Sequence, residues 1–230
     1  MLTLIRVVST FRAMDLPLSP RELLTTTRSV RKRLDLERPV DREDVVDALR
    51  VAFQAPNGSN QQMWGWVCVD DPATRSAMAD VYRGAMDDHI AMMDVQRAKG
   101  TGGVYAVQSR QAEIGASVFH LRQHLHEVPV LVVPTVEGRL DGVSIFDQAS
   151  RWGSILPGVW NFMLALRSKG MGSAWTTIHL HREREMAELL GIPYDRVTQA
   201  GLFPVAHTIG TDFRAADRSE SDATIRWNHW

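Results

Sequence analysis

The chain of 230 residues has very little cysteine, with Cys68 as its single thiol. One thiol cannot form an internal disulfide, and it cannot supply the several sulfur ligands of a cysteine-built zinc site. Cys68 stands in an aromatic and β-branched segment, where we expect it to act as a small buried apolar filler. A chain without a disulfide framework suits a reducing compartment, so the sequence favours a cytoplasmic protein.

An excess of charge and a long apolar run are also missing. With 26 basic and 27 acidic residues the net charge is −1, which gives no electrostatic basis for nucleic acid or a membrane surface as the main partner. No run of about 18 apolar residues predicts a transmembrane helix. The sequence contains neither a P-loop lysine motif nor a Gly-x-Ser-x-Gly elbow, so P-loop nucleotide hydrolysis and esterase chemistry lack their usual parts.

The first 19 residues are expected to form an N-terminal extension. Their apolar start is interrupted by Arg6 and lacks the layout of a signal peptide, and Met14 is an alternative start. Ser19 as N-cap and Pro20 at the first helical position then open a helix. With 230 residues, the chain has room for one or two domains.

Residues 41–69 predict a helix, a polar elbow and a strand. Asp41 is placed as the N-cap of an amphipathic helix over residues 41–54. Its expected core face consists of Val45, Val46, Leu49, Ala52 and Phe53. The aromatic and β-branched residues 64–69 favour a strand. Between the two, residues 55–64 contain Asn, Gly and Ser, which permit tight turns and offer backbone N–H groups and amides to a polar ligand. An ordinary helix-to-strand loop would have the same composition.

The remaining chain predicts further helices and strands. Helices are expected from Pro72 past Met93, over residues 147–167 and over residues 182–190, and strands over residues 127–134 and within 199–209. Pro157 and the following glycine should kink or locally break the long helix. Lys169 and Gly170 form a typical helix end after it.

Residues 25–33 are rich in hydroxyls and then in basic side chains. Arginine forks together with a hydroxyl suit phosphate oxygens, although a solvated charged face would have the same composition.

Residues 84–125 predict a lid or a substrate-facing insert. Their pattern becomes less regular from Asp87, and residues 100–103 form a glycine-rich break. Surface helices would show the same pattern. His120 and His124 share a helical face, but the glutamate of a zincin is missing between them, so we expect no metal site.

The tail over residues 211–230 is polar and carries Trp227 and Trp230. Because exposed tryptophans are unfavourable in water, we expect this tail to dock on its own subunit or on a neighbour.

Four segments, in their order and spacing, resemble the FMN-dependent nitroreductase superfamily. They are residues 28–31, 55–62 and 170–177, and the tail with Arg218 and Trp227. The resemblance spans roughly residues 20–230. It implies an α+β fold with a mainly antiparallel central sheet flanked by helices. It also implies an intertwined homodimer with two FMN sites at the subunit interface, in which the helix starting near Asp147 is central.

The resemblance also assigns a place to each cofactor-binding residue. In the first segment, Arg28, Ser29, Val30 and Arg31 would bind FMN: Arg28 and Ser29 would hold the phosphate together with Arg218, and Arg31 would approach the N1 and C2-carbonyl side of the ring. A cation at that side stabilises the negative charge of the reduced flavin. Pro56, Asn57, Gly58 and Asn60 would contact the flavin from the elbow, and Trp175, Thr176 and Thr177 would line the ring from the other side.

The sequence departs from the pattern of that superfamily at several positions. Thr27 stands where many relatives have another arginine, Asn57 where a serine is usual, and Met63 where a proline commonly precedes the tryptophan. In the tail, residues 218–221 read Arg-Ser-Glu-Ser. These changes bear on phosphate affinity and on elbow geometry, while the main donors are retained.

The resemblance implies an FMN-dependent oxidoreductase that passes hydride from NAD(P)H through flavin N5 to a small organic acceptor such as a nitroaromatic, a quinone or an enone. One flavin site would serve both substrates in turn, so the kinetics would be ping-pong. No catalytic acid or base is assigned, because the flavin carries the redox chemistry. Alternatives are a reductive dehalogenase or a flavin-fragmenting relative of the same fold, a non-catalytic flavin-binding sensor, and a purely structural dimer.

Overall fold

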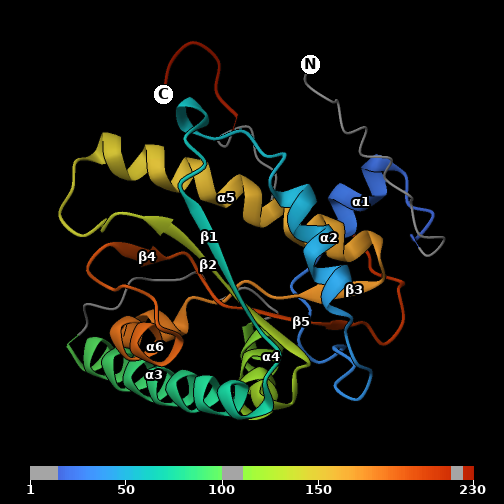
Figure 1. Cartoon of the computed structure of the whole chain (residues 1–230), viewed down its shortest axis with the longest axis horizontal. Helices are drawn as coiled ribbons and strands as arrows, with labels where there is room; N and C mark the ends of the chain where they lie inside the picture. The colour runs from blue at the N-terminus through green and yellow to red at the C-terminus, as the bar shows by residue number, and fades with distance from the viewer. Residues whose placement is uncertain (1–14, 100–110, 219–224) are drawn as a thin grey trace, which may run out of the picture.

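The fold is built on a five-stranded antiparallel sheet. It is seen in a computed structural model that describes residues 15–99, 111–218 and 225–230 (Figure 1). The strands are β1 Trp64–Val69, β2 Val130–Glu137, β3 Met171–Ser173, β4 Val197–Gln199 and β5 Phe203–His207. Their order is β1-β2-β5-β3, with β4 pairing on β2, and every pair is antiparallel. The expected antiparallel α+β fold is therefore confirmed.

Helices cover both faces of this sheet (Figure 1). One layer contains α1 Pro20–Thr26, α2 Arg42–Ala52 and α5 Ile145–Ser168, and the other contains α3 Pro72–Ala98, α4 Gln111–His124 and α6 Glu183–Leu190. Short 3-10 turns are η1 Gly58–Asn60, η2 Leu125–Glu127 and η3 Ile178–Arg182. Within the described ranges, no helix has the length and apolar character needed to cross a membrane.

The central strand β2 separates two hydrophobic cores. Successive side chains of a strand point to opposite faces, and β2 follows this rule. Leu131 and Val133 pack with the core under α3, whereas Val130 and Val132 pack with the core under α2 and α5. Both faces of β2 are buried, which explains its dense apolar run. The strand begins at Val130, three residues later than the expected range of 127–134.

Local end signals in the sequence are confirmed at several helices. Ser19 accepts from the Glu22 amide, and the Glu22 carboxylate accepts from the Ser19 amide, which completes a capping box at α1. Gly170 has a φ of 70° after α5. The expected local break at Pro157 is wrong, because α5 is one continuous helix, while the alternative of a kink stays a prediction. Burial of its apolar face against α2 and β2 offsets the lost backbone hydrogen bond at the proline.

The N-cap and the buried face of α2 differ from expectation. Asp41 occupies the N-cap of α2 but makes no capping hydrogen bond through its side chain. The buried stripe of α2 is Val45, Ala48, Leu49 and Ala52, which follows the helical repeat strictly. Val46 and Phe53 lie beside this stripe, with 41% and 45% of their surface exposed.

Cys68 is exposed and not a buried filler. It lies on edge strand β1 and lines a cavity of about 240 Å³ together with Arg42 and Val45. Partial desolvation, helped by the negative charge of Asp70, raises the pKa of its thiol to about 11. The thiol is therefore protonated near neutral pH.

The expected late strand is divided into β4 and β5. Gly201 lies between them with a φ of 155°, and a Cβ at this position would lie 2.7 Å from Nε1 of Trp175. Only glycine fits both the backbone conformation and the contact.

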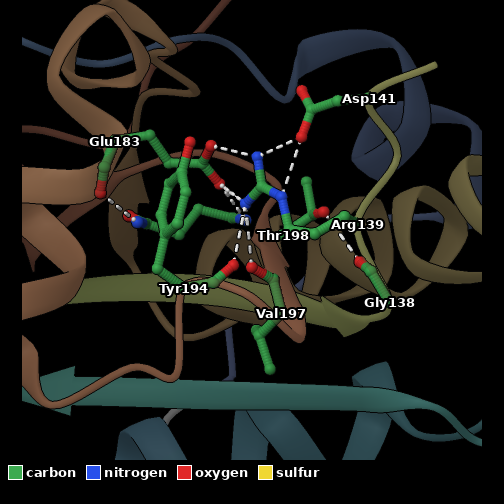
Figure 2. A network of polar contacts seen from close by, with 8 residues as sticks. Gly138, Arg139, Asp141, Glu183, Tyr194, Val197 and Thr198 are labelled. Atoms are coloured by element: carbon green, nitrogen blue, oxygen red, sulfur yellow. Dashed lines mark hydrogen bonds and ion pairs between the residues drawn. The ribbon is translucent and has the colours of Figure 1, made fainter.

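Arg139 ties α6 to strand β4 (Figure 2). Its guanidinium donates two hydrogen bonds to Glu183, at 2.9 and 2.8 Å, and also bonds to Asp141. The Glu183 carboxylate additionally accepts from the Gln199 amide at 3.0 Å. The hydrogen bond to Glu183 is the main reason why the pKa of Arg139 is raised, and Asp141 adds to it. Burial acts in the opposite direction. With side chains only 18% and 13% exposed, Arg139 and Glu183 form a largely desolvated pair.

Removing one member of this pair should destabilise the fold. We expect Glu183→Ala to lower the free energy of unfolding by about 3 kcal/mol, because Arg139 would keep its desolvation cost and lose its bidentate acceptor. The matched control is Glu185→Ala on the same helix, where a 54% exposed carboxylate lies 3.6 Å from Arg182. That change should cost less than about 1 kcal/mol. Urea denaturation measures both, and equal losses would contradict the assigned role.

Candidate functional site

Residues 29–35 extend the sheet beyond β3 and beside β5. The Val30 amide donates to the Ser173 carbonyl at 2.8 Å, and Ser29 forms a parallel bridge with Ser173. Further along, the Asp35 amide donates to the His207 carbonyl at 2.8 Å. The expected cofactor segment 28–31 and the segment 170–177 are therefore brought together by backbone pairing.

Side chains of this segment alternate between the core and the outside. Val30 is buried against Gly172, where an added Cβ would lie 3.0 Å from the Val30 Cβ. Ser29 is exposed, whereas Arg28 and Arg31 are half-buried. Val30 thus anchors the segment to the sheet.

Arg31 carries a partly desolvated charge. Burial lowers the pKa of its guanidinium, and the nearby Tyr82 phenol acts in the opposite direction. Among the described residues, no carboxylate forms an ion pair with Arg31. Because burying a cation without a counter-charge is unfavourable, this position suits an electron-rich ligand.

Hydroxyls of Thr25, Thr26 and Thr27 are already engaged within α1. Each donates to the carbonyl four residues earlier, at 2.8, 2.7 and 2.6 Å. Their hydrogens are therefore not directed at a phosphate. The hydroxyl that remains in the expected phosphate segment is that of Ser29.

Residues 175–177 point in different directions. Trp175 donates to the Ala200 carbonyl at 3.3 Å and packs on Phe203. Thr176 is buried, and its backbone exchanges hydrogen bonds of 3.1 and 2.8 Å with Leu202. Thr177 is exposed. Of the three side chains expected to line a flavin, that of Thr177 is the most accessible in the isolated chain.

Tyr82 is a residue of this cluster that sequence reasoning missed. It lies in the helix expected from Pro72 past Met93. Its hydroxyl lies 3.1 Å from Oγ1 of Thr176, and both side chains are buried. Burial raises the pKa of Tyr82, while Thr176 and Arg31 lower it. Tyr82 is therefore hydrogen-bonded to Thr176 and lies within the electrostatic influence of Arg31. The signal in the sequence was a tyrosine on a core-facing helix position, which needs a polar partner.

The elbow is a strained polar turn seated on α5. The Gly58 amide donates to Oγ of Ser154 at 2.9 Å, and Oδ1 of Asn57 accepts from the Gln62 amide at 3.0 Å. Ser59, Asn60 and Gln62 have φ values of 52°, 54° and 51°, which are unfavourable for residues with a Cβ. Pro56, Gly58 and Asn60 are exposed, and Asn57 is half-buried. Such strain is found at functional loops.

Two groups of expected flavin residues lie at different places on one chain. The elbow precedes β1 and contacts α5 at Ser154, whereas residues 28–31 lie beside β3, which follows the far end of α5 (Figure 1). At 1.5 Å per residue, the part of α5 from Ser154 to its end at Ser168 spans about 21 Å. If both groups bind the flavin, as the resemblance implies, the chain presents two partial sites.

Arg218 and the tail tryptophans are exposed. Trp227 and Trp230 are 84% and 100% exposed, so they do not pack on this chain, and docking on a neighbour stays a prediction. Arg218 is exposed and belongs to the same tail.

The expected lid over residues 84–125 contains the second half of α3 and the whole of α4. Its glycine-rich break lies outside the described residues. Large apolar side chains are exposed here: Ile90, Met92, Val95, Ile114 and Phe119.

The rings of His120 and His124 have centroids 4.4 Å apart and are tilted by 36° to each other. Across residues 15–99, 111–218 and 225–230, no group of three or more His, Cys, Asp or Glu side chains is arranged to hold a metal ion.

The profile of the Nitroreductase family matches residues 24–207. The chain belongs to this family. It is 25% identical over 140 residues to a 5,6-dimethylbenzimidazole synthase from Rhodospirillum rubrum, a match that covers 61% of each chain.

Solved structures share the fold. A BluB-like flavoprotein from Clostridium difficile 630 has a TM-score of 0.68 at 15% identity, covering 92% of this chain and 100% of that one. An iodotyrosine deiodinase bound to FMN and 3-iodo-L-tyrosine has a TM-score of 0.64 at 22% identity, covering 91% and 99%. The FMN- and NADPH-dependent nitroreductase NfnB from Sphigopyxis sp. strain HMH has a TM-score of 0.62 at 20% identity, covering 93% and 100%.

His179 lies in η3, two residues after Thr177, and makes the stability of the fold dependent on pH. Burial lowers its pKa to about 4, and the Gln199 side chain offsets only part of this effect. In the unfolded chain the ring takes up a proton near pH 6.5, so the unfolded state gains a proton that the folded state does not bind. Stability should therefore fall as the pH drops from 6.5 towards 4.

Because of His179, the free energy of unfolding should be about 2 kcal/mol lower at pH 5 than at pH 7. Urea denaturation at the two pH values measures the loss, which should shrink by that amount in His179→Gln. The control is His229→Gln, in the exposed end of the tail. An unchanged loss in His179→Gln would show that the buried ring does not titrate as described.

Proposed function

We propose that this protein is an FMN-dependent oxidoreductase that takes hydride from NAD(P)H and passes the electrons to a small organic acceptor. The observation that carries the proposal is the partly buried guanidinium of Arg31, which interacts electrostatically with Tyr82, whose buried hydroxyl is hydrogen-bonded to Thr176. Membership of the Nitroreductase family supports it. Nitroaromatics, quinones and enones are acceptors of the expected kind.

The residues present suit FMN. Ser29 offers an exposed hydroxyl, and Arg28 and Arg218 offer guanidinium groups for a phosphate. Arg31 offers a cation to the electron-rich N1 side of an isoalloxazine ring. When bound, FMN supplies a ring that accepts hydride from the nicotinamide and returns the electrons to the acceptor.

Within the protein, each polar residue of the cluster has a separate task. Arg31 stabilises negative charge near the ring, and its partial burial strengthens this effect because less water screens it. Tyr82 holds the hydroxyl of Thr176 in one orientation and thereby orders residues 175–177. Thr177 is left exposed towards the site.

We further propose that two copies of the chain complete each site. The elbow of one copy, with Pro56, Asn57, Gly58 and Asn60, would meet residues 28–31 of the other. In support, large apolar side chains are exposed on α2, at its C-terminal end and on α5: Val46, Val51, Phe53, Ile145, Phe146 and Trp160. A partner that covers them would remove this apolar surface from water.

The acceptor is proposed to bind beneath residues 84–125. Exposed Ile90 and Met92 on α3 and Phe119 on α4 suit an apolar or aromatic ring. Methionine side chains adapt to differently shaped partners, which favours a broad range of acceptors.

A second candidate is a reaction of the dehalogenating or flavin-fragmenting kind. The observation that favours it is the similarity to a 5,6-dimethylbenzimidazole synthase. In such a reaction the flavin would be consumed, or a halide released, in place of simple turnover.

Anaerobic absorbance spectroscopy of the FMN-loaded protein tests these alternatives. We expect NADPH or NADH to bleach the flavin band at about 450 nm, and a nitroaromatic or quinone to restore it. Ping-pong kinetics should follow, with parallel double-reciprocal lines.

Other outcomes would contradict the proposal. Permanent loss of the band after air is admitted would favour flavin fragmentation, and halide release from a halogenated phenol would favour dehalogenation. A bound flavin that neither nicotinamide reduces would indicate a sensor. Failure to take up FMN would overturn the proposal.

A further inference from the structure

The C-terminal tail is fastened to Arg33 as soon as it leaves the sheet. The Ile209 amide donates to the Arg33 carbonyl at 2.8 Å, and Nε of Arg33 donates back to the Ile209 carbonyl at 2.8 Å. Nη2 of Arg33 then pairs with Asp212 at 2.6 Å. Main-chain and side-chain contacts of one residue thus hold the first turn of the tail.

Two guanidinium groups lie close to the ring of Phe213. The Arg33 guanidinium is 4.2 Å from the centre of its ring, and that of Arg167 is 5.0 Å away. Both distances are within the range of cation–π attraction. Phe213 is half-buried and joins the tail to the end of α5 as well as to Arg33.

Arg167 has few other partners. It is only 4% exposed, and within the described residues its guanidinium donates one hydrogen bond, from Nη2 to the Thr211 carbonyl at 2.9 Å. Its Nε and Nη1 atoms are buried without hydrogen bonds. Burial lowers the pKa of Arg167, and the positive charge of the neighbouring Arg33 adds a smaller effect in the same direction. Within the described residues no carboxylate pairs with it, so the Phe213 ring and the tail carbonyl provide the compensation for this buried cation.

Arg33, Arg167 and Phe213 form a cation–π clamp, which is close in sequence to Ser29 and Arg218 of the expected phosphate site. Ser29 precedes Arg33 by four residues on the segment paired with the sheet. Arg218 follows Phe213 by five residues, a stretch that reaches at most about 18 Å when extended. Fixing Phe213 beside Arg33 therefore limits where Arg218 can lie relative to Ser29.

We propose that Phe213, clamped by Arg33 and Arg167, is a positioning residue that directs Arg218 to the phosphate of the bound cofactor. The inference rests on the proposed FMN-dependent function. Phe213 itself does not touch the cofactor. It acts by removing the freedom of the tail, so that less entropy is lost when Arg218 binds the phosphate.

Titration of the full-length apoprotein with FMN and with riboflavin tests this role. Riboflavin has the same ring system but no phosphate, so it does not use Arg218. We expect Phe213→Ala to raise the Kd for FMN about tenfold, or about 1.4 kcal/mol, while the Kd for riboflavin changes less than about twofold. Quenching of flavin fluorescence measures both constants.

Two further variants distinguish positioning from a general structural effect. Phe213→Tyr keeps an aromatic ring and should retain the wild-type Kd for FMN. If Phe213 acts through Arg218, then Phe213→Ala and Arg218→Ala should not be additive, and the double variant should bind FMN about as weakly as Arg218→Ala alone.

Several results would overturn the inference. One is an unchanged Kd for FMN in Phe213→Ala, and another is equal weakening of FMN and riboflavin. Full additivity with Arg218→Ala would also exclude positioning. If the wild-type protein binds riboflavin and FMN equally well, the phosphate contact itself is absent; if it binds neither, the proposed function fails instead.

Discussion

The hydrogen bond from the Val30 amide to the Ser173 carbonyl joins the two parts of the chain on which the proposed site depends. It places residues 28–31 along the outer side of β3, and the missing side chain of Gly172 allows Val30 to pack there. The charge of Arg31 then acts on Tyr82, which is hydrogen-bonded to Thr176. Without this pairing, the basic segment would have no fixed relation to the residues that follow α5.

The long helix α5 gives the site its second constraint. One end supports the elbow through Ser154, and the other leads through Gly170 into β3. Because α5 is continuous, the two partial sites are held at a fixed separation. A rigid spacer of this kind favours completion of each site by a second copy over closure within one chain.

Much of the local structure could be predicted from the sequence, because it depends on short-range patterns. The capping box at Ser19, the amphipathic helix α2 and the apolar strand β2 each have such a pattern. The continuity of α5 through Pro157 could not be read in this way, since it depends on packing along the whole helix. Exposure of Cys68 likewise depends on β1 being an edge strand.

The candidate site was predictable only in part. Motif resemblance pointed to Arg31 and Thr176, but nothing local reveals that Tyr82, about fifty residues after Arg31, bonds to Thr176. The cation–π clamp on Phe213 has the same origin, because Arg33 and Arg167 meet only in the folded chain. Long-range pairing of polar groups is decided by the fold, and short sequence patterns do not record it.

The most direct test of the account is the FMN content of a mixed dimer. Arg31→Glu reverses the charge in one partial site, and Pro56→Trp places a bulky ring on the exposed elbow of the other. Each variant alone should bind no FMN. If two chains build each site, a heterodimer of the two variants, isolated through different affinity tags, contains one intact site and should bind about one FMN. A heterodimer without FMN would contradict the account, because every site would then lie within a single damaged chain.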